Sequence, residues 1–301
     1  MTLPPIVIAC STDEGYAPGL AVMIRSLLDH YRGQTPLELY VLQTDLLEKT
    51  KQRLLSSTKD PRLKIIFLQP DMLPMQGLPC FLNVHPAMYY YLALPKLLSS
   101  YGKVLKMDAD MLVCGDITAL WETDLDNHPM AATRELRSPY VSSDWALPNY
   151  QELGIPPMTP YCNAGLQLIN LDIWRSEEIA EKIIEHTRKY ESIVRYWDQD
   201  GVNAVLAGRW LELDPIWNVE AEALILTGWI PEHPAEVHNI VEHAKIIHYI
   251  VHKPWKEGCM HPRAALFQRY LKRTAWKSLA RDLCPCWLCR MTKVVKSLFP
   301  K

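Results

Sequence analysis

The sequence predicts an α/β fold in which a mainly parallel sheet is flanked by helices and followed by a basic helical tail. Up to about residue 135, short apolar runs alternate with segments of helical spacing, as in strand–helix–strand units. The chain has 301 residues, of which 49% are hydrophobic and 22% are charged, so it can bury a large globular core. No apolar run approaches the roughly 18 residues of a membrane-spanning helix.

The individual elements follow from the spacing of the apolar residues. Strands are predicted at residues 6–10, 37–42, 63–68, 103–107, 166–170 and 245–249, where short runs are rich in Val, Ile and Leu. Helices are predicted at residues 20–30, 46–56, 86–98, 173–190 and 199–207. Residues 137–160 are rich in proline and predict a long binding loop. Because ligands of such sheets bind at the carboxyl ends of the strands, we expect the chemistry at that edge.

Charge divides the chain into two parts. Lys and Arg total 32 against 34 Asp and Glu, so the net charge of −2 indicates no nucleic-acid partner. From His261 onward, however, ten basic residues accompany a single acid. We therefore predict a globular domain over residues 1–260 and a tail over residues 261–301 that associates with an anionic membrane surface. Residues 1–5 lack the features of a signal peptide, so we expect a cytoplasmic protein, peripheral on the inner face of the membrane.

Two carboxylates follow the strand predicted at residues 103–107. Asp108 and Asp110 lie one residue apart, so both project to the same side of an extended chain. Two adjacent like charges favour a divalent cation, which proteins hold through carboxylates and substrate phosphates. The alternative is a turn in which both Asp side chains cap backbone N–H groups.

Polar residues also lie at the ends of two other predicted strands. Ser11, Asp13 and Tyr16 follow the first strand, where they can hold a base and its ribose or close the edge of the sheet. Asn163 precedes the strand at residues 166–170, in a segment where the backbone can approach a ligand or simply enter the strand.

The last two candidate segments lie in the second half of the chain. Asp198 and Gln199 begin a predicted helix, where they can cap its N-terminus or face a substrate. His248 lies at the end of a strand and Lys253 beyond it. They can complete a metal site and neutralise phosphate, or serve as structural residues.

Taken in order, these segments resemble glycosyltransferase family 8, the retaining enzymes that transfer a sugar from a UDP-sugar. The family includes bacterial lipopolysaccharide galactosyl- and glucosyltransferases. The matching motifs are D-x-x-Y-A, K-V-L-x-x-D-x-D, N-A-G-x-x-L-I-N-L-x-x-W-R, D-Q-D-x-x-N and a late H-Y…K-P-W, over about residues 5–260. The resemblance implies a GT-A catalytic domain with a Rossmann-like, mainly parallel sheet, and a basic tail that docks on the membrane.

The resemblance also implies the roles of the site residues. Asp108, Asp110 and His248 would hold Mn²⁺, or Mg²⁺, against the UDP diphosphate. Asp198 and Gln199 would be the catalytic residues that contact the sugar. The residues implied in donor binding are Ser11, Asp13, Tyr16, Asp108, Ala109, Asp110, Asn163 and Lys253. The implied reaction moves glucose or galactose to a glycolipid or polysaccharide precursor, with the acceptor attacking from the side of the leaving group.

The chain departs from the family pattern near the predicted site. Tyr91 stands where the family often has Arg, so a cation expected to contact the donor phosphate or sugar is missing. The segment from His248 to Lys253 is one residue shorter than the usual H-x-x-G-x-x-K-P-W and lacks its Gly. Glu135 corresponds approximately to an Asp often found after the following strand.

The C-terminal tail carries two further signals. Apolar residues from Met291 to Phe299 recur at helical spacing, with Lys293 and Lys296 on the opposite side, which predicts a short helix lying on an anionic bilayer. Cys284, Cys286 and Cys289 lack a nearby fourth ligand and make a poor zinc site, so acylation and burial at the membrane interface both stay open.

Two other functions compete with the transferase. One is a non-catalytic nucleotide-sugar binding protein descended from a transferase, with a donor site weakened at Tyr91 and the shortened loop. The other is a haloacid-dehalogenase-like phosphatase, whose D-x-D also ends an apolar strand. That motif should lie near the N-terminus with Thr or Val where Leu112 stands, which makes the phosphatase the weakest of the three.

Overall fold

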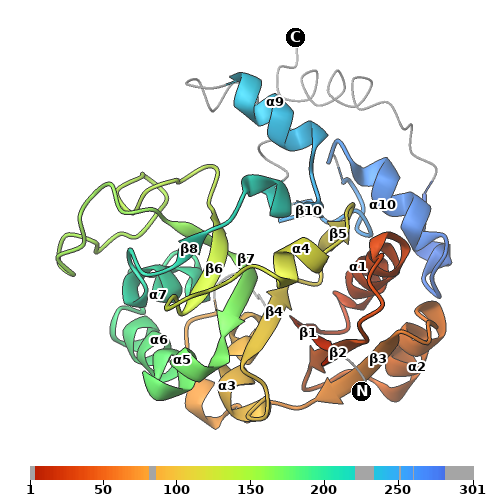
Figure 1. Ribbon diagram of the computed structural model, residues 1–301, viewed down its shortest axis with the longest axis horizontal. Helices are drawn as coiled ribbons and strands as arrows, with labels where there is room; N and C mark the ends of the chain where they lie inside the picture. Colours follow the sequence, from red (N-terminus) through yellow and green to blue (C-terminus); the bar gives the residue numbers. More distant parts are fainter. Residues whose placement is uncertain (1–3, 81–85, 221–233, 251, 260, 282–301) are drawn as a thin grey trace.

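The computed structural model describes residues 4–80, 86–220, 234–250, 252–259 and 261–281 (Figure 1). Within these residues, a seven-stranded sheet has the order β3-β2-β1-β4-β7-β6-β8. The strands are β1 (Ile6–Ser11), β2 (Leu37–Leu42), β3 (Leu63–Leu68), β4 (Lys103–Met107), β6 (Met130–Arg134), β7 (Cys162–Asn170) and β8 (Leu211–Glu212). Only β7 runs antiparallel to its neighbours in this sheet. The predicted fold class, a mainly parallel sheet flanked by helices, is confirmed.

Helices cover both faces of this sheet and bury a separate apolar core on each (Figure 1). One core lies under α1 (Ala17–His30), α2 (Glu48–Ser57), α4 (Thr118–Trp121) and α10 (Ala264–Leu271). The other lies under η2 (Pro86–Ala93), α3 (Leu94–Leu97), α5 (Leu171–Ser176), α6 (Ile179–Lys189) and α7 (Trp197–Val205). Along β1, Ile6, Ile8 and Cys10 enter the first core, whereas Val7 and Ala9 enter the second. A central strand buried on both faces reads as a continuous apolar run, as observed here.

A smaller sheet sets the position of His248. Its strands are β5 (Met111–Val113), β10 (Ile246–His248) and β9 (Val219–Glu220), in the order β5-β10-β9. β10 pairs antiparallel with β5, and His248 lies opposite Met111. Because β5 directly follows Asp110, this pairing brings the late His248 segment beside the two carboxylates that follow β4.

The predicted strands at residues 37–42, 63–68 and 103–107 coincide with β2, β3 and β4. The single helix predicted at residues 173–190 is wrong, because two helices, α5 and α6, occupy that stretch. Glu178 lies between them in the left-handed conformation, with φ 54°, which ends one helix and redirects the chain into the next. The helix predicted at residues 86–98 is mostly 3₁₀, with only α3 as α-helix.

The described remainder consists of short elements and one long loop. The remaining helices are η1 (Leu73–Met75), η3 (Pro215–Trp217), α9 (Pro234–Glu242) and η4 (Lys277–Leu279). The predicted irregular loop at residues 137–160 is confirmed, with one isolated bridge between Tyr140 and Pro160. A small core of Val141, Ala146 and Leu147 holds this loop together.

The described part of the basic tail packs against the domain. α10 lies alongside α1 (Figure 1), and Phe267, Leu271 and Trp276 are buried in the core that α1 covers. The guanidinium of Arg53 lies 4.2 Å from the centre of the Trp276 ring. The helix predicted at residues 291–299 and the three cysteines of residues 284–289 lie outside the described residues. Among the described helices, none has both the length and the apolarity needed to cross a membrane.

Candidate functional site

A cleft of about 250 Å³ lies where β1 and β4 end, at the edge at which parallel sheets bind ligands. Every residue predicted for the metal, the donor and the catalytic step lines this cleft. The structure therefore brings together segments from both ends of the chain. The cleft is also lined by residues that were not predicted as site residues: Thr12, Ala87, Met88, Lys106, Ala164, Gly165, Tyr196, Trp197 and Ile250.

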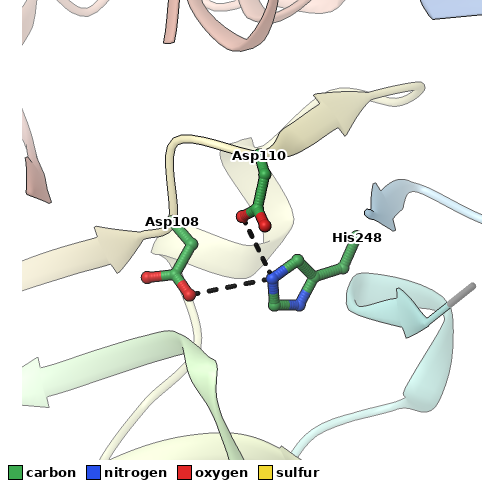
Figure 2. Close-up of side chains that lie close together, drawn as sticks. All are labelled: Asp108, Asp110 and His248. Atoms are coloured by element: carbon green, nitrogen blue, oxygen red, sulfur yellow. Dashed lines mark ion pairs between the residues drawn. The ribbon is translucent and has the colours of Figure 1, made fainter. Parts of the chain in front are cut away.

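Asp108, Asp110 and His248 form a cluster that fits a metal ion (Figure 2). One potential ligand atom from each residue lies within 4.8 Å of the others. His248 Nε2 is 3.2 Å from Asp110 Oδ1 and 3.7 Å from Asp108 Oδ2. Asp110 and His248 are only 5% and 3% exposed, so water screens them little. The two carboxylates are ligands suited to Mn²⁺ or Mg²⁺, and the imidazole is a ligand that transition-metal ions accept.

A chain of hydrogen bonds fixes which ring nitrogen of His248 faces the carboxylates. Glu135 Oε2 accepts a hydrogen bond from Asn163 Nδ2 (2.9 Å), so Asn163 turns its carbonyl oxygen toward Asn218 Nδ2 (2.9 Å). Asn218 then offers its own carbonyl oxygen to His248 Nδ1 (3.0 Å). Because that oxygen can only accept, Nδ1 carries a hydrogen, and Nε2 is the nitrogen that faces the carboxylates.

This relay orients His248 as a metal ligand would need. Its Nε2 lies 3.2 Å from Asp110 Oδ1, so both atoms point toward the place where a cation would lie. Ligating histidines commonly use their second nitrogen in such a bond to a protein oxygen. The donor set and its orientation therefore fit a metal ion.

The outer oxygen of each carboxylate pairs with a lysine. Lys106 Nζ donates to Asp108 Oδ1 (2.6 Å), and Lys253 Nζ donates to Asp110 Oδ2. Burial disfavours a charge on Asp110, but Lys253 and then His248 outweigh it and hold the pKa of Asp110 well below its usual range. Both carboxylates therefore turn one oxygen to the cluster and the other to an ammonium group.

The loop after β1 is tied to the late segment around Trp255. Trp255 Nε1 donates to the carbonyl oxygen of Gly15 (2.9 Å), and the Trp255 and Tyr16 rings meet edge to face at 5.6 Å. Asp13 Oδ1 accepts from the backbone N–H of Tyr16 (2.8 Å), so this carboxylate also closes the turn. These contacts hold the loop after β1 in place, and Tyr16 lines the cleft from this loop.

Asp198 and Gln199 face the cleft from the first turn of α7. The preceding Trp197 has φ 45°, a strained conformation for a bulky residue and one that proteins tend to keep at functional sites. Gln199 Oε1 accepts from the backbone N–H of Ala164 (2.9 Å). Burial raises the pKa of Asp198 to about 7, against the opposing effect of Lys106.

Two other polar residues of this motif have structural partners. Asp200 accepts from Tyr161 Oη and from the backbone N–H groups of Arg195 and Tyr196. Asn203 bonds to both backbone groups of Cys162, and so fixes α7 to β7. Asp200 therefore holds the segment that leads into α7, whereas Asp198 and Gln199 line the cleft.

Sequence reasoning missed Lys106 and Asn218. Lys106 carried a signal, since a lysine inside an apolar strand two positions before Asp108 must point to the same side as Asp108. Asn218 carried none, because only the pairing of β9 with β10 brings it to His248.

Comparison with known proteins gives a single family. The family described as glycosyl transferase family 8 matches residues 7–259. General stress protein A of Bacillus subtilis (strain 168) is 26% identical over 280 residues, covering 91% of this chain and 95% of that protein. Lipopolysaccharide 1,2-glucosyltransferase of Escherichia coli (strain K12) is 25% identical over 276 residues, covering 90% of this chain and 78% of that protein.

Among solved structures, the galactosyltransferase LgtC in complex with donor and acceptor sugar analogues superposes with a TM-score of 0.76. The two chains share 23% identity, and the match covers 91% of this chain and 100% of the other. At this identity the likeness concerns the fold, and it confirms the predicted GT-A architecture.

Proposed function

The chain belongs to glycosyltransferase family 8 and is a glycosyltransferase, and from this we propose that its donor is a UDP-sugar. In the proposed reaction, glucose or galactose is transferred to a glycolipid or polysaccharide-precursor acceptor. The reaction uses a divalent metal ion and retains the configuration at the anomeric carbon of the sugar. The observation that carries the proposal is the cluster of Asp108, Asp110 and His248 in a cleft whose two lysines flank it. Such an arrangement suits a diphosphate, which brings negative charge to a cation and needs donors on either side.

In this proposal the cluster holds Mn²⁺, or Mg²⁺, against the donor diphosphate. Bound there, a divalent ion would supply Lewis-acid stabilisation of the charge on the departing UDP. Asp108 and Asp110 each give it one oxygen, while Lys106 and Lys253 keep the second oxygens engaged. His248 contributes Nε2, since its bond to Asn218 occupies Nδ1.

The remaining predicted residues divide between nucleotide and sugar. We propose that uracil and ribose bind to the loop after β1, where the aromatic ring of Tyr16 and the polar groups of Ser11 and Asp13 line the cleft. We assign the sugar to Asp198 and Gln199, which face the cleft from α7. Against the competing non-catalytic nucleotide-sugar binding protein, whose donor site would be weakened at Tyr91 and the shortened loop, stands the intact cluster of Asp108, Asp110 and His248.

The proposal is tested by titrating UDP into the protein in a calorimeter, once with Mn²⁺ and once with EDTA, with ADP as the control nucleotide. We expect UDP to bind with Mn²⁺, to bind at least tenfold more weakly with EDTA, and to be preferred to ADP. Screening UDP-glucose and UDP-galactose for turnover follows. The absence of UDP binding under both conditions would contradict the donor assignment.

We also propose that the protein is cytoplasmic and binds the inner face of the membrane through its tail. Supporting this, the net charge is −2 for the whole chain, yet basic residues dominate from His261 onward. The relative that is a lipopolysaccharide 1,2-glucosyltransferase further suggests an acceptor at a membrane.

Deletion of residues 284–301 is expected to release the protein from vesicles that contain phosphatidylglycerol. These residues carry the predicted amphipathic helix, whose lysines each add about 1 kcal/mol of attraction near an anionic surface. Co-sedimentation measures the bound fraction, with phosphatidylcholine vesicles and high salt as controls. Unchanged binding by the truncated protein would refute the role of the tail.

A further inference from the structure

Lys106 is a buried cation that no predicted role accounts for. It lies inside β4, is 4% exposed, and lines the cleft beside Asp108. A lysine buried to this degree is costly unless its charge is paired or used. Its ammonium group also lies 5.0 Å from the centre of the ring of Tyr91, at the position where the sequence lacks an expected cation.

The hydrogen bonds of the two site lysines differ. Lys253 Nζ donates to Asp110 Oδ2 and to the carbonyl oxygens of Tyr249 and Ile250, which accounts for its three N–H groups. Lys106 Nζ donates to Asp108 Oδ1 (2.6 Å) and to the carbonyl oxygen of Ala164 (2.7 Å).

Two bonds leave Lys106 with one N–H to give. Among the described residues, no oxygen or nitrogen accepts it. Lys253 would have to release a partner before it could bind a phosphate, whereas Lys106 would not.

The position of Lys106 gives that N–H a target. Its partner Asp108 belongs to the metal cluster, and Asp198, which lines the same cleft, is near enough for its charge to act on Lys106. With the metal cluster assigned to the diphosphate and Asp198 to the sugar, Lys106 lies beside the bond that joins them. A fixed cation at that point stabilises the charge that develops on the leaving phosphate.

Charge balance agrees with this placement. The two negative charges of Asp108 and Asp110 are balanced by the two positive charges of Lys106 and Lys253, so the net charge of these four side chains is zero. A divalent ion bound among these four side chains would give them together a net charge of +2 to meet a diphosphate; Asp13 and Asp198, which also line the cleft, lie outside this count. Without Lys106 the site would lose one positive charge on the side of the sugar.

We propose that Lys106 contacts the donor directly, giving its remaining N–H to an oxygen of the β-phosphate next to the sugar. The assignment rests on the proposed function and deepens it. Lys106 supplies, from β4, the cation that Tyr91 does not.

The test compares UDP with UMP, which lacks the β-phosphate, in calorimetric titrations with saturating Mn²⁺. We expect Lys106→Met to weaken UDP binding about 10- to 100-fold, the loss expected for a charge-assisted hydrogen bond, and to leave UMP binding within about twofold. Unchanged UMP binding also reports that the variant is folded. Lys106→Gln, which keeps a donor for the carbonyl oxygen of Ala164, carries the same expectation if the Met variant does not fold.

Lys103→Met is the matched control. This lysine lies on the same strand, donates to the carbonyl oxygen of Trp121 and does not line the cleft, so neither nucleotide should respond. If Lys106 only orients Asp108, the variant will hold Mn²⁺ more weakly, and raising Mn²⁺ tenfold above the concentration that saturates the wild type will restore UDP binding; that result would overturn the assignment.

The two hypotheses fail in different ways. If the wild-type protein binds UDP more tightly than UMP and the Lys106→Met variant keeps this difference, the role of Lys106 is overturned and the proposed function is not. A wild-type protein that binds no UDP with Mn²⁺ overturns the proposed function and this assignment with it.

Discussion

Replacement of Asp110 by Asn is expected to abolish sugar transfer and the metal dependence of UDP binding. Asp110 is 5% exposed, turns one oxygen to His248 and gives the other to Lys253. An amide at this position removes the negative charge that both a metal ion and the ammonium group require. We expect kcat/KM to fall at least about 100-fold, since even the outer partners of metal ligands contribute 10- to 100-fold.

The fold should survive this change. Lys253 keeps its bonds to the carbonyl oxygens of Tyr249 and Ile250, and the melting temperature reports the result. Asp124→Asn, at an exposed acid outside the cleft, is the matched control and should keep full activity. A fully active Asp110→Asn variant would remove the metal assignment.

Gly165→Ala is expected to disable the same cluster without removing any of its ligands. A Cβ at Gly165 would overlap the imidazole of His248 and lie 2.9 Å from Nδ1, the atom that bonds to Asn218. It would also lie 3.0 Å from Asn163 Oδ1, within the relay that orients the ring. The imidazole must therefore move, and we expect a loss of activity of about 100-fold with a modest stability cost of about 1–3 kcal/mol.

A double-mutant cycle makes this prediction specific. Once His248 is replaced by Ala, the added methyl group has no ring to displace, so Gly165→Ala should cost little further activity. Gly102→Ala is the control, because its Cβ would meet only the carboxylate of Asp172, which is exposed and can move. Additive losses from Gly165→Ala and His248→Ala would contradict the steric explanation.

Much of the fold could be predicted from local pattern. Strands β2, β3 and β4 coincide with their predicted ranges because each is a short, mostly apolar run, a pattern typical of strands. The helix predicted at residues 173–190 was wrong because nothing in its apolar spacing marks the left-handed Glu178 that divides it. Local pattern indicates what a segment prefers, whereas a single strained residue is imposed by the packing around it.

The sequence by itself determined the family, the fold class and a set of residues that all line the cleft, because motifs in a fixed order specify chemistry at strand ends. The roles of those residues stay predictions. Only the tertiary structure decided how the site is held: which nitrogen of His248 faces Asp110, and that Lys106 shares Asp108 with the metal cluster. The physical reason is that the cluster and the orientation of His248 depend on strand pairing between distant segments, β5 with β10 and β9 with β10, and hydrogen-bond direction is fixed only once such partners meet.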